Sequence, residues 1–472
     1  MAEATRKAVI IGGGITGLSA AYYLQKEIQR LQVPLEVKLV EASHKLGGKI
    51  QTAHRSGFLI EKGPDSLFEG TGSVLQLASA VGLESQIVRS ARGTSYILSG
   101  GRLHPIPAGM ETGIPARLLP LFKTRLLSTA GKLRAAADII IPGGKYSGDQ
   151  PLGAYLRRRL GNEVVNQLSE PMLSSIFGGD IDSLSLAATF PQIDKMQKKH
   201  RSLIAGMREQ LEIMGQPYAE KGHFVTLKKG LGSLVAGLEG KLEPGSVLKG
   251  TRVEKVKKTG SGAYSLHLSN GQKLYADTVI AAIPHKGLPA LFPELSSLNS
   301  LKKDEATSVA AISMAFQLEN MPAGMDGIGF VVPSNSDYTI TACTWEHRKW
   351  PHTVPEGYGM LRCYIGRTGN ETVVGLSDEE IEQIVLDDLS RILEITSRPL
   401  FTFVSRWKNA MPQYTIGYPE RAKMLAETAG RHYPGIFVAG CSFKGNGIPA
   451  FMEQGQKAAE LAFEYLQFKK EI

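Results

Sequence analysis

A group of glycines near the start of the chain has a spacing with chemical consequences. Residues 8–11 are apolar, and the six residues that follow are Gly12, Gly13, Gly14, Ile15, Thr16 and Gly17. In the pattern G-x-G-x-x-G, the glycines allow a tight turn, the approach of a pyrophosphate and close packing of a helix on a strand. We therefore expect a strand, this turn, and a helix from about 15 to 30 whose first amides point at phosphate.

An acidic residue follows at the position where a bound dinucleotide needs an acceptor for its ribose. Residues 35–40 predict a second strand, and Glu41 comes directly after it. A carboxylate there accepts hydrogen bonds from ribose hydroxyls and disfavours a 2′-phosphate, which argues against NADP. The alternative is a βαβ unit that binds no ligand.

The residues after Glu41 resemble the second signature of one large flavoprotein class, in which two glycines, a basic residue and a hydroxyl residue follow the acid, and this resemblance favours FAD over NAD. Gly47 and Gly48 can bring the chain close to a pyrophosphate, and the cation of Lys49 can offset phosphate charge. A nicotinamide dehydrogenase has no need of this second pyrophosphate-binding segment. The four residues Gly63, Pro64, Asp65 and Ser66 have turn chemistry, and their backbone could reach an isoalloxazine. An ordinary loop is the alternative there.

In the flavoprotein class that these motifs resemble, two later segments return to the same domain. Residues 250–284 predict a β-meander that ends in a buried strand at 278–283. Near the C-terminus, a strand, a glycine loop and a helix follow one another, with Pro449 well placed at the first helical position. The start of that helix can direct its amides at the pyrimidine edge of a flavin.

The expected fold class is α/β, and α+β overall. A discontinuous Rossmann-like FAD-binding domain should comprise residues 1–66, 215–287 and 400–472. An inserted α+β substrate-binding domain is expected at 67–90, 155–214 and 288–399. A helical basic subdomain, serving as a lid or a membrane-associating element, is expected at 91–154.

Charge and composition exclude some functions. The chain has 54 Lys and Arg against 45 Asp and Glu, a net charge of +9, but no basic block with interleaved aromatic residues, so nucleic acid is not an expected partner. Cys343, Cys363 and Cys441 are too few and too scattered for a disulfide framework or a metal site, which fits a cytoplasmic location. No apolar run is long enough to predict a transmembrane helix.

The basic region at 91–134 leaves two interpretations open. Apolar residues recur there at helical spacing, namely Leu119, Phe122, Leu126, Ala130, Leu133 and Ala137. An amphipathic lid that contacts anionic lipid at the inner face of the membrane is one interpretation. A helical subdomain packed on its own protein, with a solvated basic face, is the other.

The motifs together resemble one enzyme family. The segments GGGITGLSAAYYL, EASHKLGGKIQT, EKGPDS, TACTWEHRKWPH, RWKNAMPQYTIGY and GIP look like the oxygen-dependent protoporphyrinogen and coproporphyrinogen III oxidases, in their short Gram-positive form, within the amine-oxidase-like FAD flavoproteins. The resemblance implies non-covalent FAD and the oxidation of coproporphyrinogen III to coproporphyrin III by O2 in haem biosynthesis, giving H2O2. It also implies activity on protoporphyrinogen IX. Flavin N5 accepts hydride in this chemistry, and no catalytic side chain is nominated.

The same resemblance assigns site residues. The flavin contacts it implies are Gly12, Gly13, Gly14, Ile15, Thr16, Gly17, Glu41, Ala42, Gly48, Lys49, Gly63, Pro64, Asp65, Ser66, Val253, Trp407, Gly447, Ile448 and Pro449. Tyr364 resembles a position that lines the substrate pocket, and Arg92, at the start of the basic region, is a candidate partner for a propionate. Either could instead be an ordinary residue of a strand or of the surface.

Departures from the family pattern and rival functions remain to be weighed. Asn446 and Ala450 replace a valine and an aspartate that are frequent in the family, and Cys441 stands where many flavoproteins have an acid. An amine oxidase or a carotenoid desaturase would keep the cofactor and change the pocket. A non-catalytic escort-type relative would lack flavin, and the intact glycines argue against it. The oligomeric state is left open.

Overall fold

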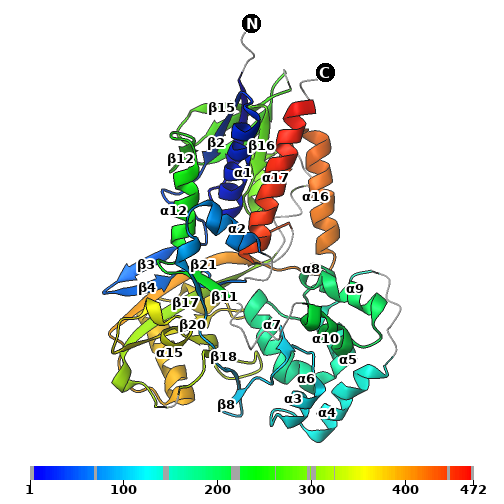
Figure 1. The fold of residues 1–472 in the computed structure, drawn as a ribbon, viewed down its shortest axis with the longest axis vertical. Coiled ribbons are helices and arrows are strands. Elements are labelled where there is room, and N and C mark those ends of the chain that lie inside the picture. The colour runs from blue at the N-terminus through cyan, green and yellow to red at the C-terminus, as the bar shows by residue number, and fades with distance from the viewer. Residues whose placement is uncertain are drawn as a thin grey trace.

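The computed structural model describes residues 5–68, 72–141, 148–213, 224–260, 262–294, 298, 305–323, 325–443 and 447–468. Figure 1 shows three regions: a sheet with long helices, which holds the first and the last elements of the chain, a larger sheet, and a layer of helices beside that larger sheet. No helix among the described residues is long and apolar enough to cross a membrane.

A five-stranded parallel sheet is assembled from three distant segments. The order is β12 (Val247–Leu248), β2 (Leu35–Val40), β1 (Arg6–Ile11), β16 (Thr278–Ala281) and β22 (Ile436–Val438). The apolar run at 8–11 forms the central strand because side chains on both of its faces are covered. The strands expected in the first segment and at 278–283 are therefore confirmed.

Helices cover one face of this sheet, and a β-meander covers the other. The helix α1 (Ile15–Leu31) begins where it is expected, and α17 (Ile448–Phe468) lies beside it in Figure 1. The meander of β13 (Val253–Lys258), β14 (Tyr264–Leu268) and β15 (Lys273–Ala276) is also confirmed. On the face of α1 lie also α2 (Ser73–Ala80) and α12 (Gly232–Lys241), whereas α13 (Leu288–Leu291) and α16 (Tyr418–His432) share the core of the meander face.

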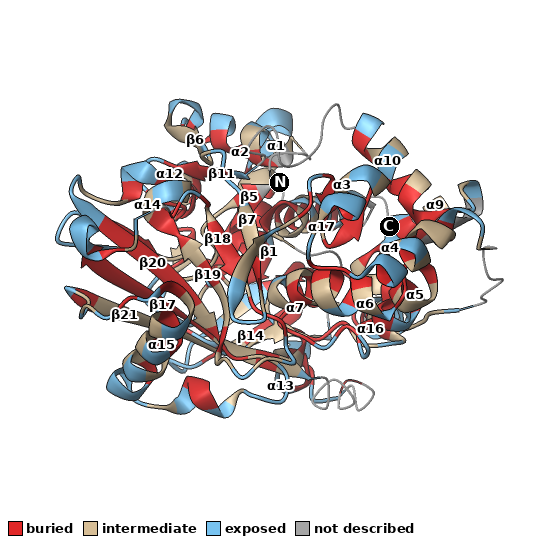
Figure 2. Cartoon of the chain, turned by 90° about the horizontal axis from the view of Figure 1, so that it is seen from below, coloured by how far each residue is buried: buried red, intermediate tan, exposed pale blue. Residues whose placement is uncertain are grey.

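The second sheet has seven strands. Its order is β21 (Phe401–Pro412), β17 (Ala306–Gln317), β20 (Tyr358–Ile365), β19 (Ile340–Trp345), β18 (Gly329–Val331), β7 (Ser95–Ser99) and β8 (Arg102–Pro105). Helix α15 (Asp378–Leu393) packs on one face, and Figure 2 shows buried residues along the central strands. The short helix α14 (Glu346–Lys349) connects β19 to β20.

Two parts of this sheet differ from the expected domain boundaries. Strand β21 lies within 400–472, a range expected in the FAD domain, but its backbone pairs with β17. Strands β7 and β8 lie within the range 91–154 that is expected to be helical, yet they form an edge of the same sheet. Pairing between strands far apart in sequence decides both positions, and local periodicity carries no signal for it.

The helical layer contains α3 (Leu118–Lys123), α4 (Thr129–Ala136) and α5 (Leu152–Leu160), together with later helices that share one core. The single apolar stripe expected over 119–137 is wrong. The chain breaks after α3, where Thr124 Oγ1 accepts from Leu126 N (3.2 Å) and Ser128 Oγ caps α4 by accepting from Gly131 N (3.0 Å). The later helices are α6 (Asn162–Val164), α7 (Glu170–Phe177), α8 (Leu186–Thr189), α9 (Pro191–Lys199) and α10 (Leu203–Ile213).

Short strands connect these regions. Strands β3 (Thr52–Arg55) and β4 (Phe58–Glu61) form a hairpin that leads into the turn at 63–66. The remaining strands are β5 (Leu67–Phe68), β6 (Ile87–Arg89) and β11 (Phe224–Leu227) in one small sheet, and β9 (Met110–Glu111) and β10 (Ile114–Pro115) in another.

Candidate functional site

The glycine turn leaves open space at the start of α1. Gly14 is the N-cap residue, no side chain caps the helix, and a Cβ built on Gly14 meets no atom within 4 Å. Gly12 has φ +103°, and a Cβ on Gly17 would lie 1.9 Å from Gly12 O. The backbone conformation therefore requires glycine at positions 12 and 17. The space at Gly14 has the opposite meaning: together with the free helix amides that begin at Ile15 and Thr16, it fits a phosphate group.

The residues expected around the adenosine half lie together. Glu41 follows β2, and its carboxylate accepts from Gly13 N (2.6 Å) and Ser43 N (2.7 Å). Glu41 O accepts from Thr251 N (2.9 Å), so Val253 begins β13 close to Glu41 and Ala42. An acidic side chain is thus placed at the edge of the glycine turn, as ribose recognition requires.

The second glycine segment is held against the first. Gly47 N donates to Gly13 O (2.8 Å), and a Cβ on Gly48 would lie 3.3 Å from Gly14 Cα. The Lys49 ammonium does not point at this junction, because it donates to Ala410 O and lies 3.9 Å from Cys441 Sγ. The cation expected to offset phosphate charge is therefore directed toward the loop after β22.

The turn at 63–66 lies between the two sheets. Trp407 on β21 donates its indole N–H to Lys62 O (2.7 Å), and the Arg362 guanidinium on β20 donates to Gly63 O. A Cβ on Gly63 would lie 1.9 Å from Lys49 O, so this position packs too closely for any larger residue. Pro64 continues the turn toward Asp65 and Ser66, which contact the end of α14.

The C-terminal part of the site begins at the described residue Gly447. Gly447 has φ +95°, Ile448 is the first residue of α17, and Pro449 follows it. A Cβ on Gly455 would lie 2.3 Å from Thr16 O, so α17 packs directly on the start of α1. The departure at Asn446 lies outside the described residues.

The two candidate substrate residues have different surroundings. Tyr364 lies on β20, half-buried, with the Arg362 guanidinium 5.1 Å from its ring centre. Burial raises the pKa of Tyr364 above its ordinary value although Arg362 opposes the shift, so the phenol is neutral. Arg92 is exposed in the loop where Ala91 N donates to Lys349 O (3.0 Å), which places it near the 63–66 turn.

The sequence reasoning did not single out Arg362 or Glu346 as site residues. Both are buried, and Arg362 joins the 63–66 turn to the strand of Tyr364. The period of two along a strand is the signal that would have found Arg362, because it places residues 362 and 364 on one face. No local pattern marks Glu346, which sits on a single helical turn.

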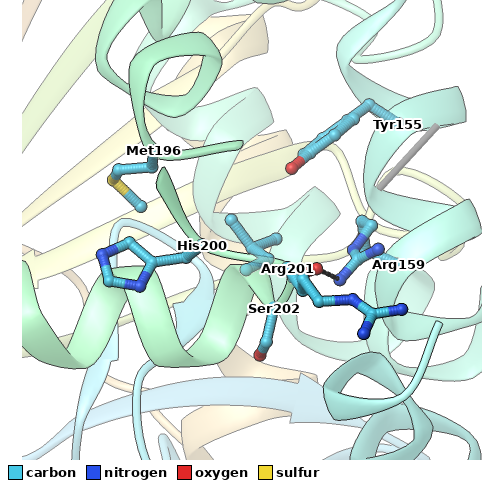
Figure 3. Close-up of a pocket in the computed structure, with 7 residues that line it drawn as sticks. Tyr155, Arg159, Met196, His200, Arg201 and Ser202 are labelled. Carbon is cyan, nitrogen blue, oxygen red and sulfur yellow. Dashed lines mark hydrogen bonds between the residues drawn. The ribbon is translucent and has the colours of Figure 1, made fainter. Parts of the chain in front are cut away.

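A cavity in the helical layer is too small for a substrate. It is bordered by Tyr155, Arg159, Met196, His200, Arg201, Ser202 and Leu203, and its volume of about 10 Å³ admits one water molecule (Figure 3). Arg159 donates to Arg201 O (2.5 Å) and pairs with the buried carboxylate of Asp138 (2.5 Å). These contacts tie the helices of the layer together.

Comparison with known proteins places the chain in a family. The model of flavin-containing amine oxidoreductases matches residues 15–462. The coproporphyrinogen III oxidase of Bacillus subtilis strain 168 is 47% identical over 99% of this chain and 100% of its own length. The enzyme of the same name from Staphylococcus aureus is 37% identical over 97% of this chain and 98% of its own length.

Solved structures agree with this placement. A crystal structure from Exiguobacterium sp. 255-15, named for protoporphyrinogen oxidase, superimposes with a TM-score of 0.87 at 36% identity, covering 98% of this chain and 99% of that one. Reduced UDP-galactopyranose mutase shares the fold at 14% identity, with a TM-score of 0.73 over 98% of this chain and 96% of that one. The chain belongs to the flavin-containing amine oxidoreductase family, in the group of coproporphyrinogen III and protoporphyrinogen oxidases.

Proposed function

We propose that this protein is an oxygen-dependent coproporphyrinogen III oxidase of haem biosynthesis, with activity also on protoporphyrinogen IX. The full-length identity of 47% to an enzyme of that name is the observation that carries the proposal. The reaction removes six electrons from the ring in three two-electron steps, with O2 as the final acceptor and H2O2 as its product.

FAD, bound without a covalent bond, is the proposed cofactor. When bound, FAD supplies two-electron acceptance from carbon and its own reoxidation by O2. The residues that would hold it are the glycine turn and free amides of α1 for the pyrophosphate, Glu41 for the ribose, Val253 for the adenine, and the 63–66 turn with Gly447 for the flavin. The open space at Gly14 supports this assignment.

We assign the domains by their sheets. The five-stranded sheet with its meander is the proposed FAD-binding domain, and the seven-stranded sheet is the proposed substrate-binding domain. On the face of Tyr364, the neighbouring strands place Ala311 and Ala342 opposite it, and Ser405 follows beside Ala311. Small side chains around a half-buried tyrosine leave room for a flat tetrapyrrole, and Arg92 near the 63–66 turn is the proposed propionate partner.

No side chain is required to act as acid or base in this proposal. Pyrrole N–H protons can be lost to water, and unsaturation can move round the ring by tautomerisation. The chain contributes orientation, since Tyr364 and the 63–66 turn approach one another through Arg362.

Turnover of two porphyrinogens tests the function. Coproporphyrinogen III and protoporphyrinogen IX, supplied separately under air, should each give rising porphyrin fluorescence with stoichiometric H2O2, and putrescine should give no H2O2. H2O2 from putrescine without porphyrin formation would establish an amine oxidase instead. Colourless purified protein that takes up no FAD would establish an escort-type relative.

Heat denaturation tests the cofactor. Precipitated holoenzyme should release a yellow supernatant whose flavin contains adenine. Flavin that stays with the pellet would establish a covalent bond, and FMN in the supernatant would exclude a dinucleotide site.

Contact with an anionic membrane at its cytoplasmic side is a further part of the proposal. Leu119, Leu133 and Ile140 on the helical layer are 67%, 60% and 77% exposed, and the same segment carries the exposed cations Lys123 and Arg125. Exposed apolar residues among cations suit a surface that rests on anionic lipid.

Vesicle sedimentation tests this contact. The holoenzyme should sediment with phosphatidylglycerol vesicles and not with phosphatidylcholine vesicles, and Leu119→Ser with Leu133→Ser should abolish sedimentation. Met424→Ser, at an exposed residue of α16, is the matched control and should leave sedimentation unchanged. If the double variant with Leu119→Ser and Leu133→Ser sedimented as much as Met424→Ser, the result would contradict the proposed membrane surface.

A further inference from the structure

Five charged side chains gather between the 63–66 turn and β20, and we name them the buried charge cluster. Glu346 and Arg362 are 4% and 1% exposed, so the centre of the group is removed from water. Among the described residues, the titratable groups Tyr364 and Cys343 also face the cluster at Glu346. The cluster comprises Glu61 of β4, Asp65 of the turn, Glu346 and Lys349 of α14, and Arg362 of β20.

Arg362 links the turn to the strand but leaves donors unused. One Nη donates to Gly63 O, whereas Nε and the other Nη have no hydrogen-bond partner among the described residues. That Nη1 lies 3.9 Å from Glu346 Oε1, which also lacks a hydrogen-bond partner there. Tyr364 packs on the same guanidinium, so Arg362 contacts both the proposed flavin turn and the proposed substrate side.

The other two carboxylates of the cluster, Asp65 and Glu61, already accept hydrogen bonds. Asp65 accepts from Lys349 Nζ (2.7 Å) and from the Trp350 indole N–H (3.2 Å). Burial alone would raise the pKa of Asp65, but Lys349 and Arg362 outweigh it and hold that pKa below its ordinary value. Glu61 accepts from Leu231 N (2.6 Å) and Thr52 Oγ1 (2.9 Å).

Counting charges shows that the cluster keeps a proton. Three carboxylates face two cations, so full ionisation would leave one uncompensated negative charge in a buried site, which is strongly unfavourable. One proton therefore stays on Glu61 or Glu346. In agreement, burial raises the pKa of each to about 7, with Asp65 adding to the shift and Arg362 opposing it. The charge of Glu61 also contributes to the raised pKa of Glu346.

We infer that Glu346 is a positioning residue that shares one proton with Glu61 and, through Arg362, sets the charge beside the flavin turn and Tyr364. The inference rests on the proposed function, because it requires FAD beside residues 63–66. A porphyrinogen that gives up a hydride carries more positive charge until a pyrrole proton leaves. Release of the shared proton to solvent leaves the cluster negative, and that charge stabilises the oxidised ring.

The absorption band of oxidised bound flavin tests the inference without turnover. Oxidised flavin has no group of its own that titrates near neutral pH, so its band reports the field of its surroundings. In wild-type holoenzyme the band position should change with pH from about pH 5 to about pH 9, with one inflection near pH 7. Glu346→Gln should abolish the inflection, because the remaining two carboxylates and two cations balance.

Three variants separate this effect from a loss of structure. Glu61→Gln should also abolish the inflection, and it serves as the second test if Glu346→Gln does not fold. Glu346→Asp keeps a titratable group and should retain the inflection. Glu111→Gln removes a different buried carboxyl, on β9 beside the helical layer, and should leave the flavin band as in the wild type.

The pH titration of the flavin band and the turnover assay can fail independently of one another. An inflection that persists in Glu346→Gln, disappears in Glu111→Gln, or is absent from the wild type overturns the inference. Since no substrate is present, a protein that fails to oxidise porphyrinogens would refute the proposed function and leave this measurement intact.

Discussion

Single glycines in this protein have different reasons to be glycine. At Gly17 a side chain would collide with the backbone of Gly12, whereas at Gly14 it would meet no protein atom. At Gly14 this open space lies at the N-terminus of α1, where the first helix amides can bind an anion, so it suits a ligand. The two positions can therefore be separated by experiment.

Gly14→Val should give a folded protein that lacks FAD. The valine side chain occupies the open space at the N-terminus of α1, where the pyrophosphate would lie, so the flavin content should fall by more than tenfold. The absorbance ratio of flavin to protein measures it. Gly240→Val, at an exposed glycine of α12 with equally free surroundings, should keep its flavin. Equal flavin content in both variants would contradict the pyrophosphate assignment.

Glu111 makes stability depend on pH. The residue is 7% exposed, and burial raises its pKa to about 7 from the ordinary value of 4.5 for a solvated glutamate. Between these pH values unfolding releases a proton, so the free energy of unfolding falls as pH rises and the loss is complete above pH 7.

Glu111→Gln should remove that dependence. Relative to the wild type, the variant should gain on the order of 2–3 kcal/mol between about pH 4 and about pH 8. Urea unfolding at both pH values measures the difference. Glu254→Gln, at an exposed residue of β13, should follow the wild-type curve, and a constant difference for Glu111→Gln would refute the role of burial.

At the scale of elements, the contact between α1 and α17 joins the two ends of the chain. The backbone of α17 at Gly455 approaches Thr16 O so closely that a Cβ would lie 2.3 Å away. The N-terminal ends of both helices face the proposed flavin site, so their separation sets its width. A side chain at this crossing must push the helices apart.

Gly455→Ala should destabilise the protein by about 1–3 kcal/mol through overpacking and should weaken FAD binding. Thermal unfolding and the FAD dissociation constant measure the two effects. Gly430→Ala, at an exposed glycine of α16 with no atom near its Cβ, should stabilise by about 0.5–1 kcal/mol and leave FAD affinity unchanged. If Gly455→Ala changed neither the thermal stability nor the FAD dissociation constant, the two helices would not be in close contact.

For the whole molecule, net charge bears on substrate choice. The chain carries +9, and coproporphyrinogen has four propionates where protoporphyrinogen has two. An unpaired buried carboxylate costs several kcal/mol, so a tetra-acid needs a rim that is cationic or wet. Arg92, exposed near the 63–66 turn, suits such a rim.

Coproporphyrinogen III should therefore be the better substrate, and salt should weaken its advantage. Each exposed pair contributes only about 0.2–1 kcal/mol and is screened by ions, so the preference should be modest. The ratio of kcat/KM for the two porphyrinogens at low and high ionic strength measures it. A preference for protoporphyrinogen that is insensitive to salt would show that charge at the rim does not select the substrate.

The wider architecture was only partly predictable. The β-meander and α1 follow from local apolar runs and turns, and they appear where they are expected. That three distant segments share one sheet was expected only from the resemblance to flavoproteins. The single apolar stripe over 119–137 does not form, because the hydrogen bond to Thr124 Oγ1 turns the chain after α3 and Ser128 caps a separate helix, α4. Strand β21 joins the seven-stranded sheet through pairing with β17, which is distant in sequence.

The sequence by itself determined the dinucleotide motif, since glycine spacing, a following helix and Glu41 are local and each residue type has a direct steric or hydrogen-bonding reason. Only the tertiary structure decided that Glu346, Arg362 and Asp65 share one buried site, because α14, β20 and the 63–66 turn meet through long-range packing. The tertiary structure also decided that the Lys49 ammonium contacts Ala410 O and Cys441 Sγ. Residue spacing can describe a turn and the helix that follows it. The charges of this site come from three elements, and they compensate one another only after folding has brought those elements together.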